Sequence, residues 1–178
     1  SSEDRPFDTD ALSQGQLNSK VWLIEELSEL DLDLGTVFLC AGWYGILATL
    51  MFENNIKLKK IRSFDIDPDV AAIAEYFNRP WVIDQWKFKA VTADIHKIDF
   101  KGHGYSVENS QGKSVDQYDF PDTVINTSCE HIDDFDAWYD SIPDGTIMIL
   151  QSNDFDDVDE HVNLSLIHIS EPTRPLYI

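Results

Sequence analysis

The chain has few cysteines, few cations and no long apolar run. The two cysteines, Cys40 and Cys129, lie far apart in different contexts, so the sequence predicts neither a disulfide framework nor a metal site. With 13 Lys and Arg against 33 Asp and Glu, the formal net charge is −20 and the cations are scattered, which disfavours nucleic acid as a partner. No run of 18 apolar residues occurs and the first 20 residues lack the features of a signal peptide, so we expect a cytoplasmic protein without a membrane partner.

The hydrophobic content is high enough for one packed domain. Of the 178 residues, 43% are hydrophobic, and a chain of this length buries roughly 70% of the surface that its unfolded form exposes. Residues 1–11 are predicted to be a flexible lead-in, followed by a single domain over 12–165. Residues 166–178 resemble the translation of a sequencing adapter, which would make them a non-native or irregular tail. The alternative is a genuine final strand over 162–169 with a Pro-containing tail.

Helical and strand patterns alternate along the domain. Apolar residues at spacings of three and four predict a helix over 12–30, with a stripe of Leu17, Val21, Ile24, Leu27 and Leu30. Continuous apolar runs predict strands at 36–41, 61–66, 88–92, 122–127 and 146–151. Further helices are expected after Gly45, from Pro68 to Asn78, and over 132–142, and residues 101–117 are expected to form a long loop. This order predicts an α/β, Rossmann-like fold: a doubly wound, mostly parallel sheet of about five to six strands flanked by helices.

The first predicted strand leads into a glycine-containing turn, made of Cys40, Ala41, Gly42, Trp43, Tyr44 and Gly45. In an open parallel sheet, ligands bind outside the carboxyl ends of the strands, where the strand order reverses. Two glycines three residues apart let the backbone approach a ligand there, and the two aromatic residues are placed to wall it. The alternative is a plain turn, because the three-glycine spacing of a dinucleotide fingerprint is absent.

Acidic residues follow the next two predicted strands. The second strand ends at Asp65-Ile66-Asp67-Pro68, where Asp65 is placed to accept hydrogen bonds from two ribose hydroxyls and Asp67 to cap a helix. The third strand is followed by Asp94, which is placed to accept from the exocyclic amine of an adenine. A polar strand end and a loop acid are the respective alternatives.

The order of these residues resembles that of the class I S-adenosylmethionine-dependent methyltransferases, particularly small phage-like members. The resemblance spans about residues 12–163 and rests on the turn over 42–45, the segment 65–68 and Ala93-Asp94. It implies S-adenosylmethionine as the cofactor, bound by residues 40–45, Asp65, Ile66 and Asp94. Within that set, Gly42 and Gly45 would face the methionine part, Asp65 the ribose and Asp94 the adenine.

Two departures from the family pattern stand out. In the pattern acidic-x-Gly-x-Gly-x-Gly, Cys40 takes the place of the first glycine, and no acidic residue stands just before it. The family's sheet normally ends with an antiparallel strand pair, for which few residues remain here. A sheet that lacks this pair would leave an open edge, which a homo-oligomer could cover.

The fourth predicted strand is followed by polar residues at the place where this fold puts its reacting groups. Asn126, Glu130 and His131 are the candidate catalytic residues, with Glu130 or His131 as a base if the acceptor must lose a proton. Helix capping or binding to backbone is the alternative for Glu130 and His131. Weaker candidates are Cys129 as a nucleophile, Gln151-Ser152-Asn153-Asp154 in the acceptor pocket, and, from the family's use of its leading helix, Ser13, Gln16 and Lys20 as a lid.

The favoured interpretation is methyl transfer from S-adenosylmethionine to a small-molecule acceptor. Residues 126–131 are not the Asn-Pro-Pro-Tyr type of segment that the family's amino-methylating nucleic-acid enzymes carry, in agreement with the acidity. Two alternatives keep the cofactor: a lyase or cyclase that releases methylthioadenosine, and a non-catalytic module that binds the cofactor, a nucleotide or a partner protein. A dinucleotide oxidoreductase fits less well, because the glycine spacing differs.

Overall fold

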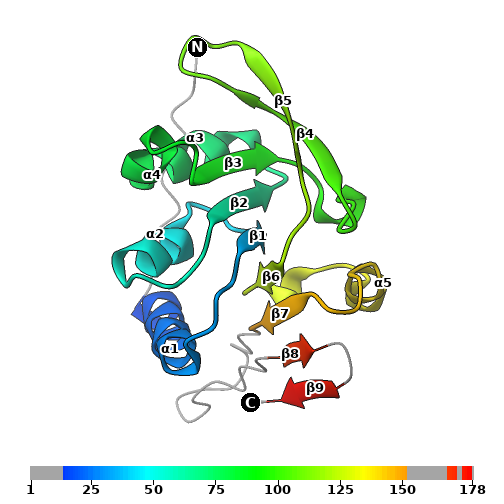
Figure 1. Ribbon diagram of the computed structural model, residues 1–178. Helices are drawn as coiled ribbons and strands as arrows, with labels where there is room; N and C mark the ends of the chain where they lie inside the picture. Colours follow the sequence, from blue (N-terminus) through cyan, green and yellow to red (C-terminus); the bar gives the residue numbers. More distant parts are fainter. Residues whose placement is uncertain (1–13, 152–167, 172–173, 178) are drawn as a thin grey trace.

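The chain is built around a five-stranded parallel sheet (Figure 1). A computed structural model describes residues 14–151, 168–171 and 174–177. The strand order is β3-β2-β1-β6-β7, and each neighbouring pair is parallel. The strands are β1 (Thr36–Cys40), β2 (Lys60–Asp65), β3 (Phe88–Thr92), β6 (Thr123–Asn126) and β7 (Ile147–Leu150). These strands coincide with the predicted ones to within a residue or so at each end, and the architecture confirms the predicted doubly wound α/β fold.

Helices cover one face of this sheet. α1 (Gln14–Leu30), α2 (Ile46–Glu53) and α3 (Pro68–Phe77) pack their apolar side chains against alternate strand residues such as Val37 and Leu39 of β1. α3 ends at Phe77, as predicted. A further short helix, α4 (Arg79–Ile83), then begins, because Pro80 stands in its first turn, where proline is tolerated.

α1 buries most of the predicted stripe, including Ile24 and Leu27, but not Val21. Its buried residues are Ser19, Leu23, Ile24 and Leu27, whereas Val21 is 45% exposed. The predicted stripe is therefore wrong at Val21. The helix meets the sheet along the line through Leu23 and Leu27, which are separated by one turn.

A β-hairpin and a helix cover the opposite face. β4 (His103–Glu108) pairs antiparallel with β5 (Ser114–Asp119), and α5 (Phe135–Asp140) adds Trp138 to the same apolar cluster. The prediction of a long loop over 101–117 is wrong. Tyr105 and Val107 are buried between exposed neighbours in β4, a period of two that is typical of a strand but is short and interrupted by Gly, Ser and His.

At the carboxyl edge of the sheet, the chain segments that follow neighbouring strands β1 and β6 diverge. β1 is central, with β2 and β3 on one side and β6 and β7 on the other. The hairpin β4–β5 connects the two halves, since it lies between β3 and β6 in the chain. The segments that follow β1 and β6 therefore lead away in opposite directions, and a crevice is expected between them.

A second antiparallel hairpin, β8 (His168–Glu171) with β9 (Arg174–Tyr177), forms a separate two-stranded sheet. It falls within the residues interpreted above as a tail, and the origin of that segment stays a prediction. The predicted lead-in over 1–11 lies outside the described residues. Among the helices of the described ranges, none is long and apolar enough to cross a membrane.

Candidate ligand pocket

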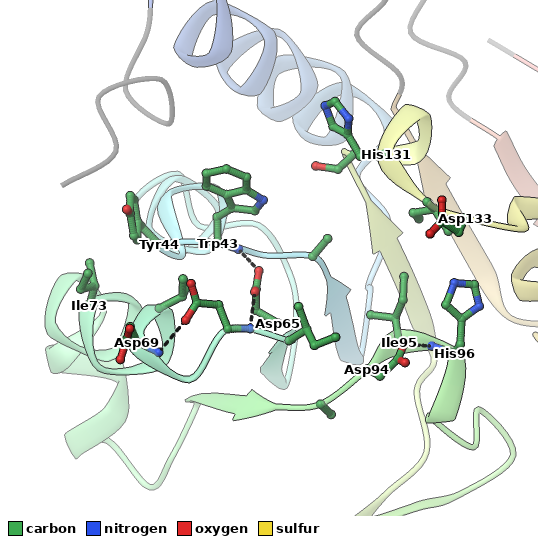
Figure 2. Close-up of a pocket in the computed structure, with 17 residues that line it drawn as sticks. Trp43, Tyr44, Asp65, Asp69, Ile73, Asp94, Ile95, His96, His131 and Asp133 are labelled. Atoms are coloured by element: carbon green, nitrogen blue, oxygen red, sulfur yellow. Dashed lines mark hydrogen bonds between the residues drawn. The ribbon is translucent and has the colours of Figure 1, made fainter. Parts of the chain in front are cut away.

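A pocket opens at the carboxyl ends of the parallel strands (Figure 2). Its volume is about 690 Å³, within the range of cofactor and small-molecule sites. Its walls come from residues 41–44 after β1, 65–73 after β2, 93–96 after β3 and 128–133 after β6. Because the strand order reverses between β1 and β6, the pocket lies where open parallel sheets bind ligands.

The turn after β1 places three residues in the left-handed region. Ala41, Trp43 and Gly45 have φ values of 55°, 48° and 72°. Glycine takes this conformation without strain, whereas alanine and tryptophan do so at a cost. Cys40 is the last residue of β1, opposite Phe64 and Asn126, and its place as the first glycine of the family pattern stays a prediction.

A side chain at either glycine of this turn would point into the protein and not into the pocket. A Cβ on Gly42 would collide with the Ser63 hydroxyl of β2, and a Cβ on Gly45 would lie 2.6 Å from Asn78 Nδ2. Asn78 is fully buried and donates from Nδ2 to Gly45 O at 3.0 Å, while its Oδ1 accepts from Thr49 Oγ1 at 2.9 Å. The glycines thus allow the turn to pack against β2 and the end of α3.

Asp65 connects the first two strand ends. Its Oδ2 accepts a hydrogen bond from the Trp43 N–H at 3.2 Å, and its Oδ1 accepts from the Asp67 N–H at 3.0 Å. A carboxylate has about four lone-pair sites, so these two bonds leave acceptor capacity for a ligand. Asp65 therefore both holds the turn and presents its carboxylate to the pocket.

Asp67 and Asp94 cap the starts of short helical segments on the pocket wall. Asp67 Oδ1 accepts from the Asp69 N–H at 2.9 Å, which confirms the predicted cap of α3. Asp94 Oδ1 accepts from the His96 N–H at 3.0 Å, where a single 3-10 turn begins. Both residues also line the pocket. They can therefore cap a helical segment and contact a ligand at the same time.

Of the three candidate catalytic residues, only His131 lines the pocket. Its side chain is 73% exposed, and its Nε2 lies 3.5 Å from Glu130 Oε1. Asn126 is fully buried at the end of β6, where its Oδ1 accepts from the Ser128 N–H at 2.9 Å. Asn126 therefore shapes the turn that carries His131, and its position does not bring it to the pocket wall.

Cys129 lacks the properties of a nucleophile. Burial of the thiol, with a contribution from the charge of Glu130, raises the pKa of Cys129 to about 12. Its Sγ donates to Asn126 O at 3.3 Å. Because the thiolate is the reactive form, a thiol protonated at neutral pH supports the alternative of a small residue near a strand end.

Among the remaining weaker candidates, those that the structure describes do not line the pocket. Gln151 is buried, and its Nε2 donates to Ser19 O of α1 at 3.2 Å, so it joins the helix to the sheet. Lys20 Nζ donates to Gln16 Oε1 at 3.4 Å along α1, away from the pocket wall. Ser13 and residues 152–154 lie outside the described residues.

Most of the predicted cofactor residues line the pocket: Ala41, Trp43, Tyr44, Asp65, Ile66 and Asp94. The other three, Cys40, Gly42 and Gly45, do not line it. The sequence interpretation missed the wall formed by α3, to which Asp69, Val70 and Ile73 belong. The helical pattern from Pro68 to Asn78 predicts the helix but not that its side chains line a pocket. The signal that could have found them is their place in the first turns of a helix that starts at the ligand edge.

Comparisons with known proteins agree on the fold. No protein-family model and no curated protein matches the chain. A protein from Methanococcus maripaludis assigned to the S-adenosyl-L-methionine-dependent methyltransferases matches with a TM-score of 0.53 and 13% identity over 77% of this chain and 57% of that one. The N-methyltransferase NodS from Bradyrhizobium japonicum, in complex with S-adenosyl-L-homocysteine, matches with a TM-score of 0.53 and 11% identity over 84% of this chain and 67% of that one. The amino pentose methyltransferase CalS10 from Micromonospora echinaspora, bound to S-adenosylmethionine, matches with a TM-score of 0.51 and 11% identity over 86% of this chain and 58% of that one.

At these identities, the likeness is one of fold. The chain spans between 57% and 67% of the length of these three solved structures. The chain therefore shares its fold with these S-adenosylmethionine-dependent methyltransferase structures.

Proposed function

We propose that the chain binds S-adenosylmethionine in this pocket and transfers its methyl group to a small-molecule acceptor. The observation that carries the proposal is the convergence of Asp65 and Asp94, from two different strands, on one pocket at the strand-order reversal. Two structures with the same fold hold the methylated or demethylated form of this cofactor.

The pocket residues fit the chemical groups of the cofactor. Ribose hydroxyls and an adenine amine are hydrogen-bond donors, and the open acceptor sites of Asp65 and Asp94 suit them. Ile66 and Ile95 add apolar wall surface for the planar base. A dinucleotide fits less well, because several carboxylates would face its negatively charged pyrophosphate.

The chain contributes mainly alignment to such a reaction. S-adenosylmethionine supplies a methyl group on a positively charged sulfur, and in-line displacement at that carbon needs an acceptor held at the correct angle. A base is required only where the acceptor loses a proton. We assign this role to His131, which lines the pocket, and we assign Glu130 the role of positioning the imidazole, since it lies 3.5 Å from Nε2.

The first test is calorimetric titration of the purified protein with S-adenosylmethionine, with NAD titrated in parallel. Micromolar binding of S-adenosylmethionine alone is the expected result. Preferential binding of NAD would replace the proposal with a dinucleotide enzyme, and binding of neither compound would contradict it.

Asp65→Ala tests the placement of the cofactor. The variant is expected to weaken binding by about 1–3 kcal/mol, because it removes charge-assisted hydrogen bonds to the ribose. Asp144→Asn, at an exposed turn position that does not line the pocket, is the control and should bind as the wild type does. Unchanged affinity in folded Asp65→Ala protein would show that Asp65 does not hold the ligand.

The reaction product separates transfer from the other uses of the cofactor. Incubation with S-adenosylmethionine alone should leave it intact if the protein is a transferase that needs an acceptor. Release of methylthioadenosine in that mixture would identify a lyase or cyclase. Binding that never leads to S-adenosylhomocysteine with any amine, hydroxyl or thiol acceptor would favour a non-catalytic module.

A further inference from the structure

The connection from β3 to β4 forms one wall of the pocket at its start and enters the hairpin at its end (Figure 1). Its first residues, 93–96, line the pocket. Residues 99–103 form a tight turn, in which Asp99 O accepts from the Gly102 N–H at 3.1 Å. The wall and this turn are separated by residues 97–98 alone. A change in the turn therefore acts close to the pocket wall.

The turn is closed by a hydrogen bond that only a neutral histidine can accept. The Asp99 N–H donates to Nδ1 of His103 at 3.2 Å. An imidazole nitrogen accepts a hydrogen bond only while it carries no proton, and in the imidazolium both ring nitrogens are donors. Protonation of His103 therefore breaks this bond and turns two N–H groups toward each other.

Packing holds the ring of His103 in the orientation that this bond requires. The imidazole is stacked on Tyr105, with centroids 6.1 Å apart and an angle of 12° between the planes. It meets Phe64 edge-on, with centroids 5.8 Å apart and an angle of 74°. Phe64 is fully buried in β2. The two aromatic neighbours keep Nδ1 directed at the Asp99 N–H.

Charged groups from three elements surround His103. Asp99 lies in the turn, and Asp119 stands opposite His103 in β5. Lys60 and Arg62 of β2 pair with Asp119, so the charge of this carboxylate is compensated. Partial burial lowers the pKa of His103 below its ordinary value, and the charge of Asp99 opposes this shift. The folded chain therefore favours the neutral imidazole that the turn requires.

We propose that the hydrogen bond between Asp99 and His103 is a proton-sensitive latch on the connection between the pocket wall and the hairpin. The neutral imidazole closes the turn, and the imidazolium opens it and loosens the wall over 93–96. Because the unfolded chain accepts the proton more readily, the latch stabilises the fold fully above about pH 6.5, and this contribution is lost as the pH falls through the lower folded pKa. The effect on a ligand rests on the proposed function, whereas the opening of the turn does not.

Hydrogen exchange at the Asp99 amide measures the latch directly. Its protection, corrected for the intrinsic pH dependence of exchange, should fall about fivefold between about pH 7.5 and about pH 5. The Ala93 amide is the internal reference, because it donates at 2.9 Å to the backbone carbonyl of Asp65, which does not titrate. Constant protection at Asp99, or equal losses at both amides, would overturn the proposal.

Two variants separate the acceptor from the ring. His103→Asn places a carbonyl oxygen close to the position of Nδ1, and this oxygen accepts at every pH, so the protection of Asp99 should no longer depend on pH. His103→Phe keeps an aromatic ring without an acceptor, so the protection should be low at both pH values. The unfolding midpoint at neutral pH verifies that each variant is folded. A response of the wild-type size in His103→Asn would assign the titration to another group and contradict the proposal.

Asp99→Asn tests the charge beside the imidazole. It keeps an oxygen for the Lys101 N–H, which donates to Asp99 Oδ1 at 2.9 Å, but removes the charge that favours the imidazolium. The exchange transition and the NMR titration of the His103 ring should both shift to lower pH. Asp116→Asn, on the exposed face of β5, is the matched control and should leave both unchanged. An unshifted transition in Asp99→Asn would show that His103 does not cause it.

Calorimetry with S-adenosylmethionine tests the effect on the pocket wall. The wild type and His103→Asn both keep His96 and His131, so a difference between their pH profiles comes from His103. Between about pH 7.5 and about pH 5.5, the wild type should lose about threefold more affinity than the variant. The effect is small because Ile98 and Phe100 anchor the connection in the core. Equal losses would overturn the effect on the wall. Absence of binding at both pH values would overturn the proposed function, whereas the exchange experiment would still decide the latch.

Discussion

At the scale of single residues, the position of the turn after β1 depends on a contact that lies behind the pocket. Gly45 has a positive φ, and its missing side chain leaves room for Asn78, which donates to the Gly45 carbonyl and to Ala74 O at 2.9 Å. This side chain joins the turn to the end of α3. The pocket wall that follows β1 is thereby attached to the helix that follows β2.

Gly45→Ala should destabilise the fold by more than the cost of a left-handed alanine. The added Cβ would lie 2.6 Å from Asn78 Nδ2, so overpacking of about 1–3 kcal/mol adds to a backbone cost of about 1 kcal/mol. Gly112→Ala is the matched control, because Gly112 has nearly the same φ, +73°, and within the described chain no atom lies within 4 Å of its built Cβ. Urea unfolding of both variants measures the difference, and equal losses would contradict the clash.

At the scale of elements, buried charges attach the hairpin β4–β5 to the sheet. Arg62 of β2 is almost fully buried, and its Nε donates to Tyr105 Oη at 2.6 Å. Tyr105 in turn donates to Asp119 Oδ2 at 2.5 Å, and Lys60 pairs with the same carboxylate. Lys89 of β3 donates to Glu108 O at 3.0 Å. The hairpin is thus bound by a polar network as well as by its apolar face.

Tyr105→Phe should destabilise the protein by about 1–3 kcal/mol, because it leaves the buried Arg62 Nε and Asp119 without their common partner. Burial, followed by the hydrogen bond to Asp119, raises the pKa of Tyr105 to about 12. Since the folded pKa exceeds the unfolded value of about 10, the stabilising contribution is complete below about pH 10 and is lost as the pH rises through 12.

Chemical unfolding across this alkaline range provides the measurement. The wild type should lose stability more steeply with pH than Tyr105→Phe. Tyr118→Phe removes a hydroxyl from an exposed position of the same hairpin and should follow the wild type. Parallel curves for the wild type and Tyr105→Phe would show that Tyr105 does not titrate in this way.

At the scale of the whole molecule, the net charge of −20 opposes compaction. Carboxylates at like-charged surfaces repel one another, and dissolved salt screens this repulsion over about 10 Å at 0.1 M. The buried pairs that hold the hairpin are screened much less. Salt is therefore expected to relieve the repulsion more than it weakens the internal attractions.

The midpoint of thermal unfolding should consequently rise by several degrees between low ionic strength and about 0.5 M NaCl. An uncharged solute at the same osmolality is the control, because it does not screen charge. A midpoint that stays constant or falls with NaCl would indicate that attractive surface pairs outweigh the net repulsion.

Local patterns were sufficient to predict the five central strands and the capping role of Asp67. Buried parallel strands are continuous apolar runs, and a cap acts within a few residues of itself, so both signals are local in the chain. The same reasoning failed for β4, whose alternation is short and interrupted by Gly, Ser and His. It failed again for Val21, because the buried face of a helix depends on what packs against it.

By itself, the sequence determined the fold class, the succession of the five parallel strands along the chain and the acidic residues at the strand ends. These follow from periodicity and from the rule that ligands bind at the carboxyl edge of a parallel sheet. Only the tertiary structure decided that Gly45 makes room for Asn78, that Trp43 adopts a left-handed backbone conformation, and that His131 rather than Asn126 lines the pocket. Each of these depends on backbone dihedrals and on contacts between residues distant in the chain, which no local pattern of residue types specifies.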